Sequence, residues 1–593
     1  MQADSFKNGA AAGDSHGTGG TFVIATDSFG VASGNADDAA RLAAIRGQVA
    51  RRSRPDASDG AKRLTAPRSE TARWKAAASV ATGTGVYIGG LAPKHHGFST
   101  DNFILTPAPA QPFDTESYAY QPDNRFIRTL DNSVSTFAVD VDTASYTNVR
   151  RFLDGGRLPP PDAVHVEELV NYFSYDYAPP PRDSAAPFAA SMEVAAAPWN
   201  PAHRLVRIGI KGRELDAATR PPASLVFLLD VSGSMDAPNR LPLVKDAMRM
   251  LLGTLRPDDR VAIVTYAGAS GLALPSTPAS KKREILAALD ALRARGSTNG
   301  AMGIQLAYDV ARANFIEGGA NRVILCTDGD FNVGVTGDDD LARLIGEKAR
   351  SGVFLTVLGF GMGNYKSAKL EQLANKGNGQ HAYIDSRAEA RRMLVGQSGA
   401  TLFTIAKDVK LQVEFNPAAA RSYRLIGYEN RLLAREDFNN DKVDAGEIGA
   451  GHTVTALYEV VPPGADSGDA APGAPPVDPL KYQAPAPRPV NLDFAGELLT
   501  LKIRFKAPSA DESELLEFAL VDSRRAFADA SGDFKFASSV AAFGMVLRGS
   551  PDRGAADYGK VLDWAESGLG PDADGHRGEF LNLVRRAKEI AAN

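Results

Sequence analysis

Oxygen-bearing side chains in three separated segments have the types and spacing of a divalent-metal site. DVSGS at 230–234 directly follows the apolar run SLVFLL, STNG at 297–300 opens a predicted helix, and TDG at 327–329 follows the run RVILC. Hard cations such as Mg²⁺ take oxygen ligands at about 2.0–2.1 Å and usually keep several waters. The sequence therefore predicts a site for Mg²⁺, or for Mn²⁺ or Ca²⁺, with these ligands: Asp230, Ser232, Ser234, Thr298 and Asp328.

Three of the five predicted ligands are hydroxyls, which carry no charge. With the two carboxylates acting partly through water, a bound dication keeps positive charge that an outside carboxylate can neutralise. We therefore expect a binding protein that takes an Asp or Glu of a protein partner, and no catalysis. Without metal, Asp230 and Asp328 are expected to face each other uncompensated, which predicts a less stable metal-free form.

The elements that position these residues alternate between apolar runs and helical patterns from 224 to about 402. Runs at 224–229, 260–266, 322–326 and 353–360 are nearly continuous, as strands covered on both faces require. Helices are predicted at about 241–255, 281–294, 299–315, 338–351, 364–376 and 387–402, and the last two bracket a short run at 381–384. This rhythm indicates a doubly wound α/β domain with a mainly parallel sheet, whose ligands bind beyond the carboxyl ends of the strands.

Together the three segments resemble the metal-ion-dependent adhesion site of von Willebrand factor type A (VWA) domains. That family's pattern is DxSxS, then a distant Thr, then a distant Asp, and all three parts occur here in order. The resemblance implies the VWA fold, a divalent cation and a partner carboxylate. The alternatives are a VWA domain with an idle site, or an Asp-Ser cluster that merely caps the following helix.

The flanks of this domain, at 135–173 and 428–460, are similar to a bacterial group of VWA proteins with a dedicated N-terminal segment and a C-terminal domain of unknown function. Members of that group are commonly predicted lipoproteins, so the resemblance implies the cell envelope or periplasm. The single cysteine, Cys326, is internal, so a lipid anchor requires a leader upstream of Met1. Otherwise the expected location is cytoplasmic.

Strand patterns occur both before and after the α/β segment. They lie at about 188–197 and 204–211 on one side and at 409–415, 453–461 and 498–505 on the other. Neither set makes a sandwich alone, so we expect the α/β domain to be inserted into a β-sandwich built from about 188–215 and 406–507.

The predicted organisation has five parts. They are a mostly disordered region at 1–128, a VWA-associated N-terminal segment at 129–220, the VWA domain at 221–403, a β-rich domain at 404–507 with a Pro/Ala/Gly-rich loop at 462–489, and a helical C-terminal domain at 508–593. Helices in the last part are predicted at 512–530, 533–548, 557–566 and 577–591.

Composition argues against a nucleic-acid partner and against a membrane-spanning segment. The 66 basic and 71 acidic residues give a net charge of −5 with no basic segment, so no nucleic-acid partner is expected. The sequence contains no run of about 18 apolar residues, so no membrane-spanning segment is expected. Cys326 lies in an apolar run and is expected to pack inside a strand.

Several look-alike motifs favour structural roles. Asp140 and Asp142 fail the spacing of a phosphatase nucleophile loop and are expected to cap the helix that begins near Ser145. The stretch 437–448 lacks the Gly and Glu of a calcium loop and is expected to be a β-connection. The pair His95-His96, and also His165 and His381, are expected to be ordinary histidines.

Two functions from other classes remain open. A metal-assisted hydrolase at the same site needs a general base, for which Asp236 and Asp330 are the nearest candidates. A structural envelope scaffold with an inactive site needs neither metal nor base.

Overall fold

The structure is a computed structural model that describes residues 118–592 except 119, 140–141, 217, 268–269, 297–299, 330–337, 362–366, 466–493 and 495. The chain divides into two compact units, Met1–Gln111 and Pro112–Asn593, and the described residues belong to the second. Most of the predicted disordered region, the pair His95-His96 and most of the Pro-rich loop therefore lie outside the described residues.

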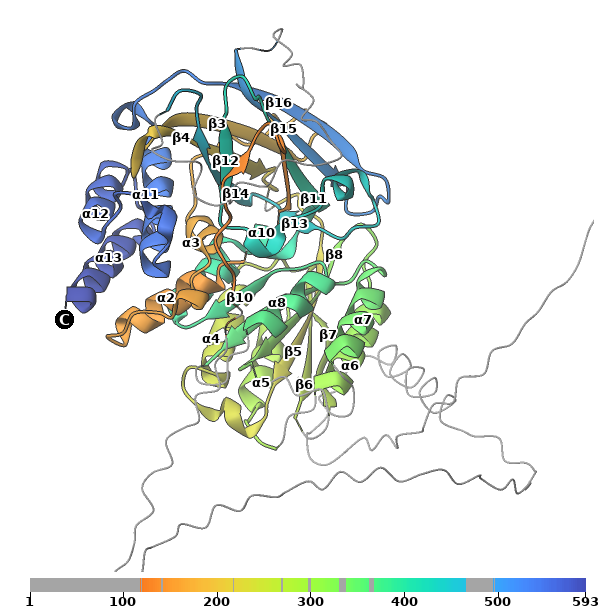
Figure 1. Ribbon diagram of the computed structural model, residues 1–593. Helices are drawn as coiled ribbons and strands as arrows, with labels where there is room; N and C mark the ends of the chain where they lie inside the picture. Colours follow the sequence, from red (N-terminus) through yellow and green to blue (C-terminus); the bar gives the residue numbers. More distant parts are fainter. Residues whose placement is uncertain are drawn as a thin grey trace, which may run out of the picture. The chain divides into compact units, whose positions relative to one another are not determined.

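The α/β segment forms a six-stranded sheet in the order β10-β9-β8-β5-β6-β7 (Figure 1). Neighbouring strands are parallel except for β7, which runs antiparallel to β6 at one edge. The strands are β5 (Ala223–Asp230), β6 (Arg260–Tyr266), β7 (Ser270–Pro278), β8 (Ala320–Thr327), β9 (Phe354–Phe360) and β10 (His381–Ile384). The doubly wound parallel sheet predicted from the apolar runs is confirmed, whereas the edge strand β7 was not predicted.

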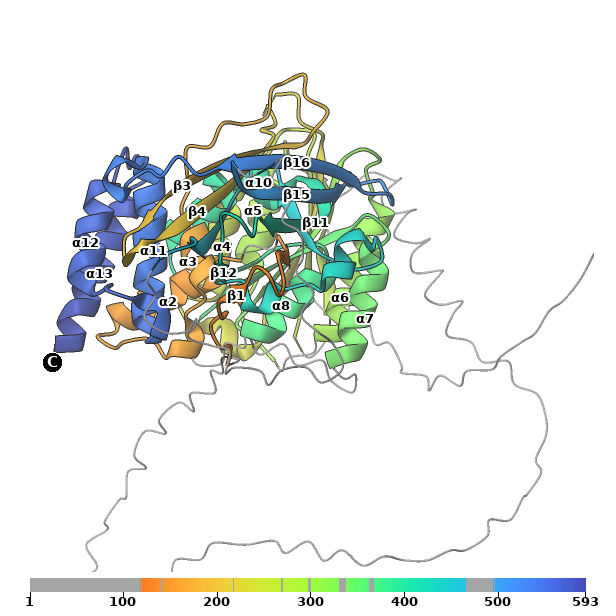
Figure 2. The same ribbon diagram turned by 45° about the horizontal axis from the view of Figure 1, so that its top comes forward.

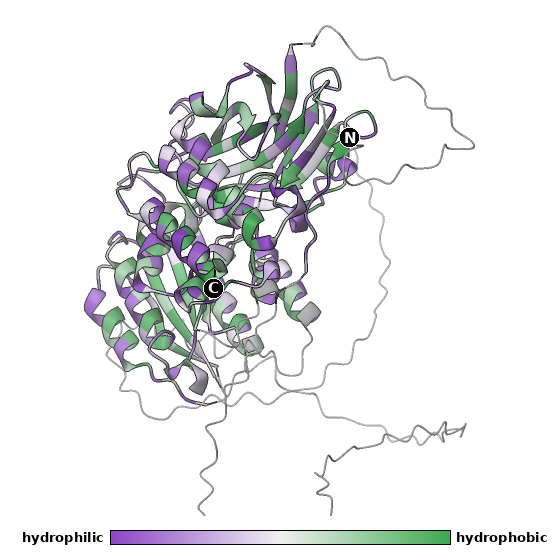
Figure 3. Ribbon diagram, turned by 60° about the vertical axis from the view of Figure 1, so that its left-hand side comes forward, coloured by the Kyte–Doolittle hydropathy of each residue, from purple (hydrophilic) through white to green (hydrophobic). Residues whose placement is uncertain are grey.

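Helices cover both faces of this sheet, which explains why its central strands are apolar throughout. One face packs against α4 (Leu241–Leu252), α5 (Lys282–Ala291) and α9 (Arg387–Arg391). The other packs against α6 (Gly300–Ala313), α7 (Asp338–Ala349) and α8 (Ser367–Lys376). Figure 3 shows predominantly hydrophobic strands between helices whose outer faces are hydrophilic. Cys326 is buried within β8, as predicted.

Two further sheets form a sandwich from strands on both sides of the α/β segment. The first has the order β1-β12-β14-β4-β3, and the second has the order β13-β11-β15-β16 with β2 also paired to β11. The strands before the α/β segment are β1 (Ile127–Arg128), β2 (Val134–Ala138), β3 (Phe188–Ala197) and β4 (Asn200–Gly212). Those after it are β11 (Thr404–Phe415), β12 (Ser422–Ile426), β13 (Gly446–Gly449), β14 (Thr453–Val461), β15 (Glu497–Lys506) and β16 (Glu514–Val521). Because β4 pairs with β14, and β2 with β11, the α/β segment is inserted into the sandwich.

A helical cluster packs against the first sheet and is formed by both ends of the described chain (Figure 2). Its members are α2 (Ala144–Asp154), α3 (Val166–Asn171), α11 (Gly532–Arg548), α12 (Tyr558–Ser567) and α13 (His576–Ala592). The helix α11 is buried along most of its length because it lies between the sheet and the other helices. Its ends follow from the sequence, since Ser531 accepts a hydrogen bond from the N–H of Phe534 and Gly549 takes a left-handed conformation with φ of 66°.

The helix predicted at 512–530 is wrong in its first part, because Glu514–Val521 is the strand β16, paired antiparallel to β15. Apolar residues in ELLEFALV fit a helical period and a strand period about equally well. Pairing decides between them, and the side chains of Leu516, Phe518 and Leu520 pack on the sandwich core. The helix predicted at 387–402 is interrupted, because a π-helical turn at Arg392–Gly396 separates α9 from α10 (Ser398–Leu402).

A buried ionic network joins α9 and the π-helical turn to the helical cluster. Glu389 is 1% exposed and accepts hydrogen bonds from Arg392 (2.6 Å) and Arg150 (3.0 Å). The hydroxyl of Tyr172 donates to the same carboxylate at 2.8 Å. Although burial raises the pKa of Glu389, the charges of Arg392 and Arg150 lower it below its ordinary value. The end of the inserted domain is therefore tied to α2 and α3 through one shared carboxylate.

None of the helices in the described part of the chain combines the length and apolarity needed to cross a bilayer. This agrees with the absence of a long apolar run in the sequence.

Candidate metal centre

The first and third predicted segments meet at the carboxyl edge of the six-stranded sheet. Asp230 is the last residue of β5, Asp328 directly follows β8, and these strands are parallel neighbours. Both carboxylates are buried, with 0% and 1% exposure. Burying two acids at adjacent strand ends is costly unless a cation or hydrogen-bond donors compensate their charge.

The loop after β5 also lies against the chain that leads to the second segment. The N–H of Gly233 donates to the carbonyl of Gly296 at 3.0 Å, and the N–H of Arg295 donates to the carbonyl of Val231 at 2.6 Å. Thr298 lies outside the described residues, so its part in the site stays a prediction. The helix α6 nevertheless begins at Gly300, directly after the STN stretch, as expected.

The hydroxyls of Ser232 and Ser234 lie side by side, with 2.9 Å between their Oγ atoms. The carboxylate of Asp230 holds this loop in place, since its Oδ1 accepts the N–H of Ser232 at 2.8 Å. Neither serine caps the next element with its side chain: Ser232 precedes a short 3₁₀ turn without such a bond, and the helix α4 begins after Arg240. The capping alternative to a metal site is therefore wrong in this structure.

Asp230 is buried but accepts hydrogen bonds from its neighbours. Its Oδ2 accepts a hydrogen bond from the hydroxyl of Tyr266, at the end of β6, at 3.1 Å. Burial raises the pKa of Asp230 to about 6 and the negative charge of Asp328 adds to this, while hydrogen bonds from Ser232 act against it. A cation beside Asp230 would therefore favour its ionised form.

No motif in the sequence singled out Arg240, which contacts two residues of the site. The Nη1 of Arg240 donates to Oδ2 of Asp328 at 2.9 Å and to the carbonyl of Ser234 at 2.6 Å. The side chain passes over Gly361, where any Cβ would overlap the guanidinium. Asp328 is therefore not uncompensated in the absence of metal, and the expectation that both aspartates lack a countercharge is wrong for this one.

The donor set of the described residues fits a hard dication. Two buried carboxylates and two adjacent hydroxyls are oxygen ligands of the kind that Mg²⁺, Mn²⁺ and Ca²⁺ prefer. Asp230, Ser232, Ser234 and Asp328 are the described residues that would hold it, and Arg240 competes with it for Asp328.

Replacing Arg240 with Gln is expected to tighten Mg²⁺ binding about tenfold, because a positive charge next to the site no longer repels the ion, a change of ~1.4 kcal/mol. The metal-free variant should also melt at a lower temperature, since Asp328 loses its buried partner. Calorimetric titration with Mg²⁺ measures the first effect and thermal melting the second. Arg283→Gln, on the exposed face of α5, is the control. Unchanged or weaker Mg²⁺ binding in the Arg240 variant would contradict the competition.

Where the structure describes them, the other residues singled out in the sequence occupy structural positions. Asp142 does not cap α2, whose cap position is Thr143 and has no side-chain bond. Instead its Oδ1 accepts the N–H of His381 at 2.8 Å, and His381 itself is buried. Asp140 lies outside the described residues. The stretch 437–448 runs from a 3₁₀ turn into β13, which agrees with the expected β-connection.

Three known protein families match parts of the chain. Residues 224–397 match the von Willebrand factor type A domain, a class of protein-interaction domains. Residues 112–207 match a family described as von Willebrand factor. Residues 400–590 match a family described as the C-terminal part of the uncharacterized protein YfbK.

The chain is also similar to individual proteins. The chain is 44% identical over 481 residues to the uncharacterized protein YfbK of Escherichia coli, covering 80% of this chain and 82% of that protein. It is 30% identical over 178 residues to inter-alpha-trypsin inhibitor heavy chain H3 of Bos taurus, covering 28% of this chain and 20% of that protein. Among solved structures, a von Willebrand factor type A protein from Catenulispora acidiphila is 18% identical, with a TM-score of 0.36 over 68% of this chain and 91% of that one.

Proposed function

The chain belongs to the family of the Escherichia coli protein YfbK, which joins a VWA domain to a distinct C-terminal domain, and on this basis we propose that it is a metal-ion-dependent protein-binding protein. The proposed ligand is an Asp or Glu carboxylate of a partner protein. The proposed metal is Mg²⁺, with Mn²⁺ or Ca²⁺ as substitutes, and the proposed metal ligands are Asp230, Ser232, Ser234, Thr298 and Asp328.

One observation carries this proposal. Two buried carboxylates and two hydroxyls 2.9 Å apart gather at the carboxyl edge of a parallel sheet, where the loops of doubly wound folds bind ligands. A bound dication would supply an open coordination position for a carboxylate. Asp230 orients the serine loop through the N–H of Ser232, and Arg240 holds Asp328 in position before metal binds.

Catalysis is not part of the proposal. A hydrolase needs a general base within hydrogen-bond reach of the reacting water. Of the two acids considered for that role, Asp236 is exposed on the 3₁₀ turn after β5, and Asp330 lies outside the described residues. No observation favours either of them as a base.

Affinity capture tests the proposed function. Immobilised wild-type protein should retain a partner from an envelope extract in Mg²⁺ and release it in EDTA, whereas the Asp230→Ala variant should retain none in either buffer. An excess of free acetate or glutamate should weaken the capture, because it competes for the carboxylate position. Equal retention by wild type in Mg²⁺ and EDTA would exclude metal-dependent binding. Asp236→Ala is the matched control, since Asp236 is exposed near the same loop.

Metal affinity should depend on pH through Asp230. Its pKa is about 6 in the folded chain and 3.8 ordinarily, so the proton competes with metal as pH falls below about 6. Mg²⁺ affinity should then fall about tenfold per pH unit. In the metal-free protein, the contribution of Asp230 to the stability of the fold depends on pH in the opposite direction to metal affinity. Because the pKa of Asp230 is raised in the folded chain, this contribution is present at low pH and is lost as pH rises through about 6.

Calorimetric titration between about pH 5 and pH 7 measures this dependence, with the heat of an Asp230→Asn variant subtracted so that only this site contributes. Equal affinity at the two ends of that range would show that Asp230 is not a ligand.

An envelope or periplasmic location is proposed from the family resemblance alone. Fractionation of cells that express the full-length protein tests it directly.

A further inference from the structure

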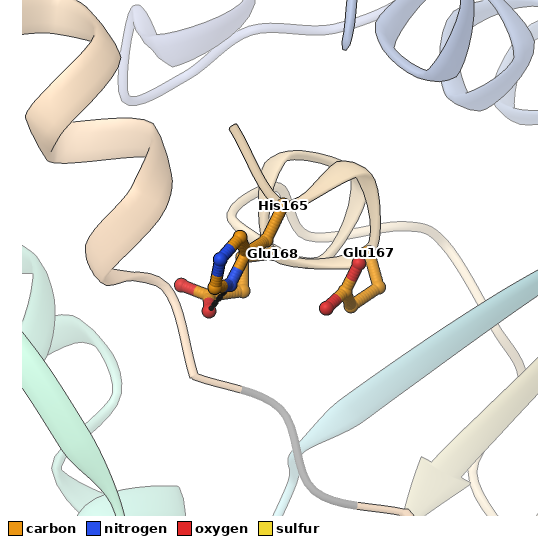
Figure 4. A group of neighbouring side chains, drawn as sticks. All are labelled: His165, Glu167 and Glu168. Carbon is orange, nitrogen blue, oxygen red and sulfur yellow. Dashed lines mark hydrogen bonds and ion pairs between the residues drawn. The ribbon is translucent and has the colours of Figure 1, made fainter. Parts of the chain in front are cut away.

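A second group of ionisable side chains lies outside the VWA site, where α3 meets the sandwich. One ligand atom from each of His165, Glu167 and Glu168 lies within 4.8 Å of the others. Figure 4 shows His165 and Glu168 joined to each other, with Glu167 standing apart from the pair. The three residues are therefore not equivalent as potential ligands.

His165 and Glu168 already pair with each other. The imidazole Nδ1 of His165 pairs with Oε1 of Glu168 at 2.8 Å, and the N–H of Ser145 donates to Oε2 of the same carboxylate at 2.8 Å. Burial lowers the pKa of His165, but the hydrogen bond and charge of Glu168 outweigh it and raise the pKa to about 9. This neutral ion pair ties α3 to the beginning of α2.

Glu167 is different, because it is 4% exposed and its Oε2 has no hydrogen-bond partner. The same is true of Glu429, whose side chain is 7% exposed and whose Oε2 is also without a partner. Glu167 lies against Gly427, which is two residues before Glu429 in the chain, because an added Cβ on Gly427 would lie 2.6 Å from the Oε2 of Glu167. Each unpaired buried carboxylate oxygen costs free energy that a cation can recover.

The charges around this pair do not balance. Arg548 contacts Asp123 at 2.8 Å and lies 3.9 Å from Glu429. It supplies one positive charge against the three carboxylates of Asp123, Glu167 and Glu429. Burial raises the pKa of Glu429 to about 7, and the charge of Glu167 is the next largest cause. The group thus has an excess of two negative charges when all of its acids are ionised.

One further oxygen in this region is also buried without a hydrogen-bond partner. A third buried acceptor without a partner, Oε1 of Gln121, belongs to the segment whose backbone carbonyl accepts a hydrogen bond from Arg548 at 2.5 Å. Buried acceptors without a partner are one of the features that a cation site presents. All of the available atoms are oxygens, which favours Ca²⁺, Mg²⁺ or Mn²⁺ over softer metals.

We propose that Glu167 and Glu429 bind a hard divalent cation at the junction of α3, the 3₁₀ turn Glu429–Arg431 and the segment that contains Gln121. This cation is separate from the VWA site and its role is to fasten the N-terminal segment to the sandwich. The dication neutralises the two excess charges, and the neighbouring His165–Glu168 pair stays intact.

The test uses the full chain with Asp230→Asn and Asp328→Asn, so that the VWA site does not contribute. After chelation, Ca²⁺ should raise its melting temperature, and Tb³⁺ should become luminescent on excitation of Tyr428, which adjoins Glu429. Mg²⁺ and Mn²⁺ are titrated in parallel. Adding Glu167→Gln or Glu429→Gln should weaken Ca²⁺ binding by about 10–100-fold or more.

The metal-free Gln variants supply the second readout. They keep the size of the side chain and remove one repelling charge, so they should melt at a higher temperature than the same chain without them. Glu436→Gln, which replaces an exposed glutamate seven positions after Glu429, should change neither Ca²⁺ binding nor the metal-free melting temperature. Absence of any Ca²⁺-dependent shift in the starting chain, with the Gln variants still more stable, would overturn the proposal in favour of a shared proton. Undiminished Ca²⁺ binding in both Gln variants would overturn it as well.

Discussion

Replacing Asp230 with Asn should abolish the rise in melting temperature that Mg²⁺ gives the chain. Asp230 is the fully buried carboxylate that organises the serine loop, so its loss removes both a charged ligand and the anchor of Ser232. Binding to the native state alone adds about 2.7 kcal/mol when Mg²⁺ is a hundredfold above its Kd. Thermal melting with Mg²⁺ or EDTA measures that gain.

Both chains in this comparison carry Glu429→Gln, so that the second proposed cation site makes no contribution. Asp236→Asn serves as the control, because it removes an exposed acid from the same loop region. If the Asp230 variant gains as much from Mg²⁺ as its parent does, the metal site is not at the carboxyl edge of β5.

Replacing Glu389 with Gln should destabilise the whole described unit by about 3–5 kcal/mol, the usual cost of removing one partner from a buried ion pair. Gln fills the same volume, so the loss comes from charge and not from a cavity. Arg392 and Arg150 are then left buried with one carboxylate fewer between them. Urea-induced unfolding at constant Mg²⁺ measures the change.

The matched control is Glu347→Gln, an exposed glutamate on α7 of the same domain, which should change stability little. The contribution of Glu389 to the free energy of unfolding also depends on pH. Since the pKa of Glu389 is lowered in the folded chain, its contribution is present at neutral pH and is lost as pH falls through the folded pKa. A loss in Glu389→Gln no larger than in the control would mean that the network is not a stabilising junction.

Much of the inserted domain follows from the sequence because its strands are buried on both faces. The runs that form β5, β6, β8 and β9 are short and almost continuously apolar, which is typical of strands buried on both faces. Asp230 and Asp328 lie together because they stand at the carboxyl ends of two neighbouring strands, β5 and β8. The edge strand β7 escaped prediction because SGLALPSTP contains two prolines and few apolar residues.

Long-range contacts account for the rest. Arg240 reaches Asp328 across 88 positions in the chain, and no local pattern encodes that meeting. Asp142 was expected to cap a helix because of its place in the sequence, but its carboxylate accepts a hydrogen bond from the N–H of His381 instead. Likewise Glu167 and Glu429 come from distant segments, and only folding makes them neighbours.

The interrupted sandwich has a consequence for synthesis on the ribosome. The inserted sheet has all of its strands between Ala223 and Ile384, so it can fold as soon as that stretch has emerged. The hairpin of β3 and β4 emerges earlier but must wait for β14, since Arg207 pairs with Leu457. During that interval its apolar face is open to chaperones and to other nascent chains, so slow translation between the two halves would favour misassembly.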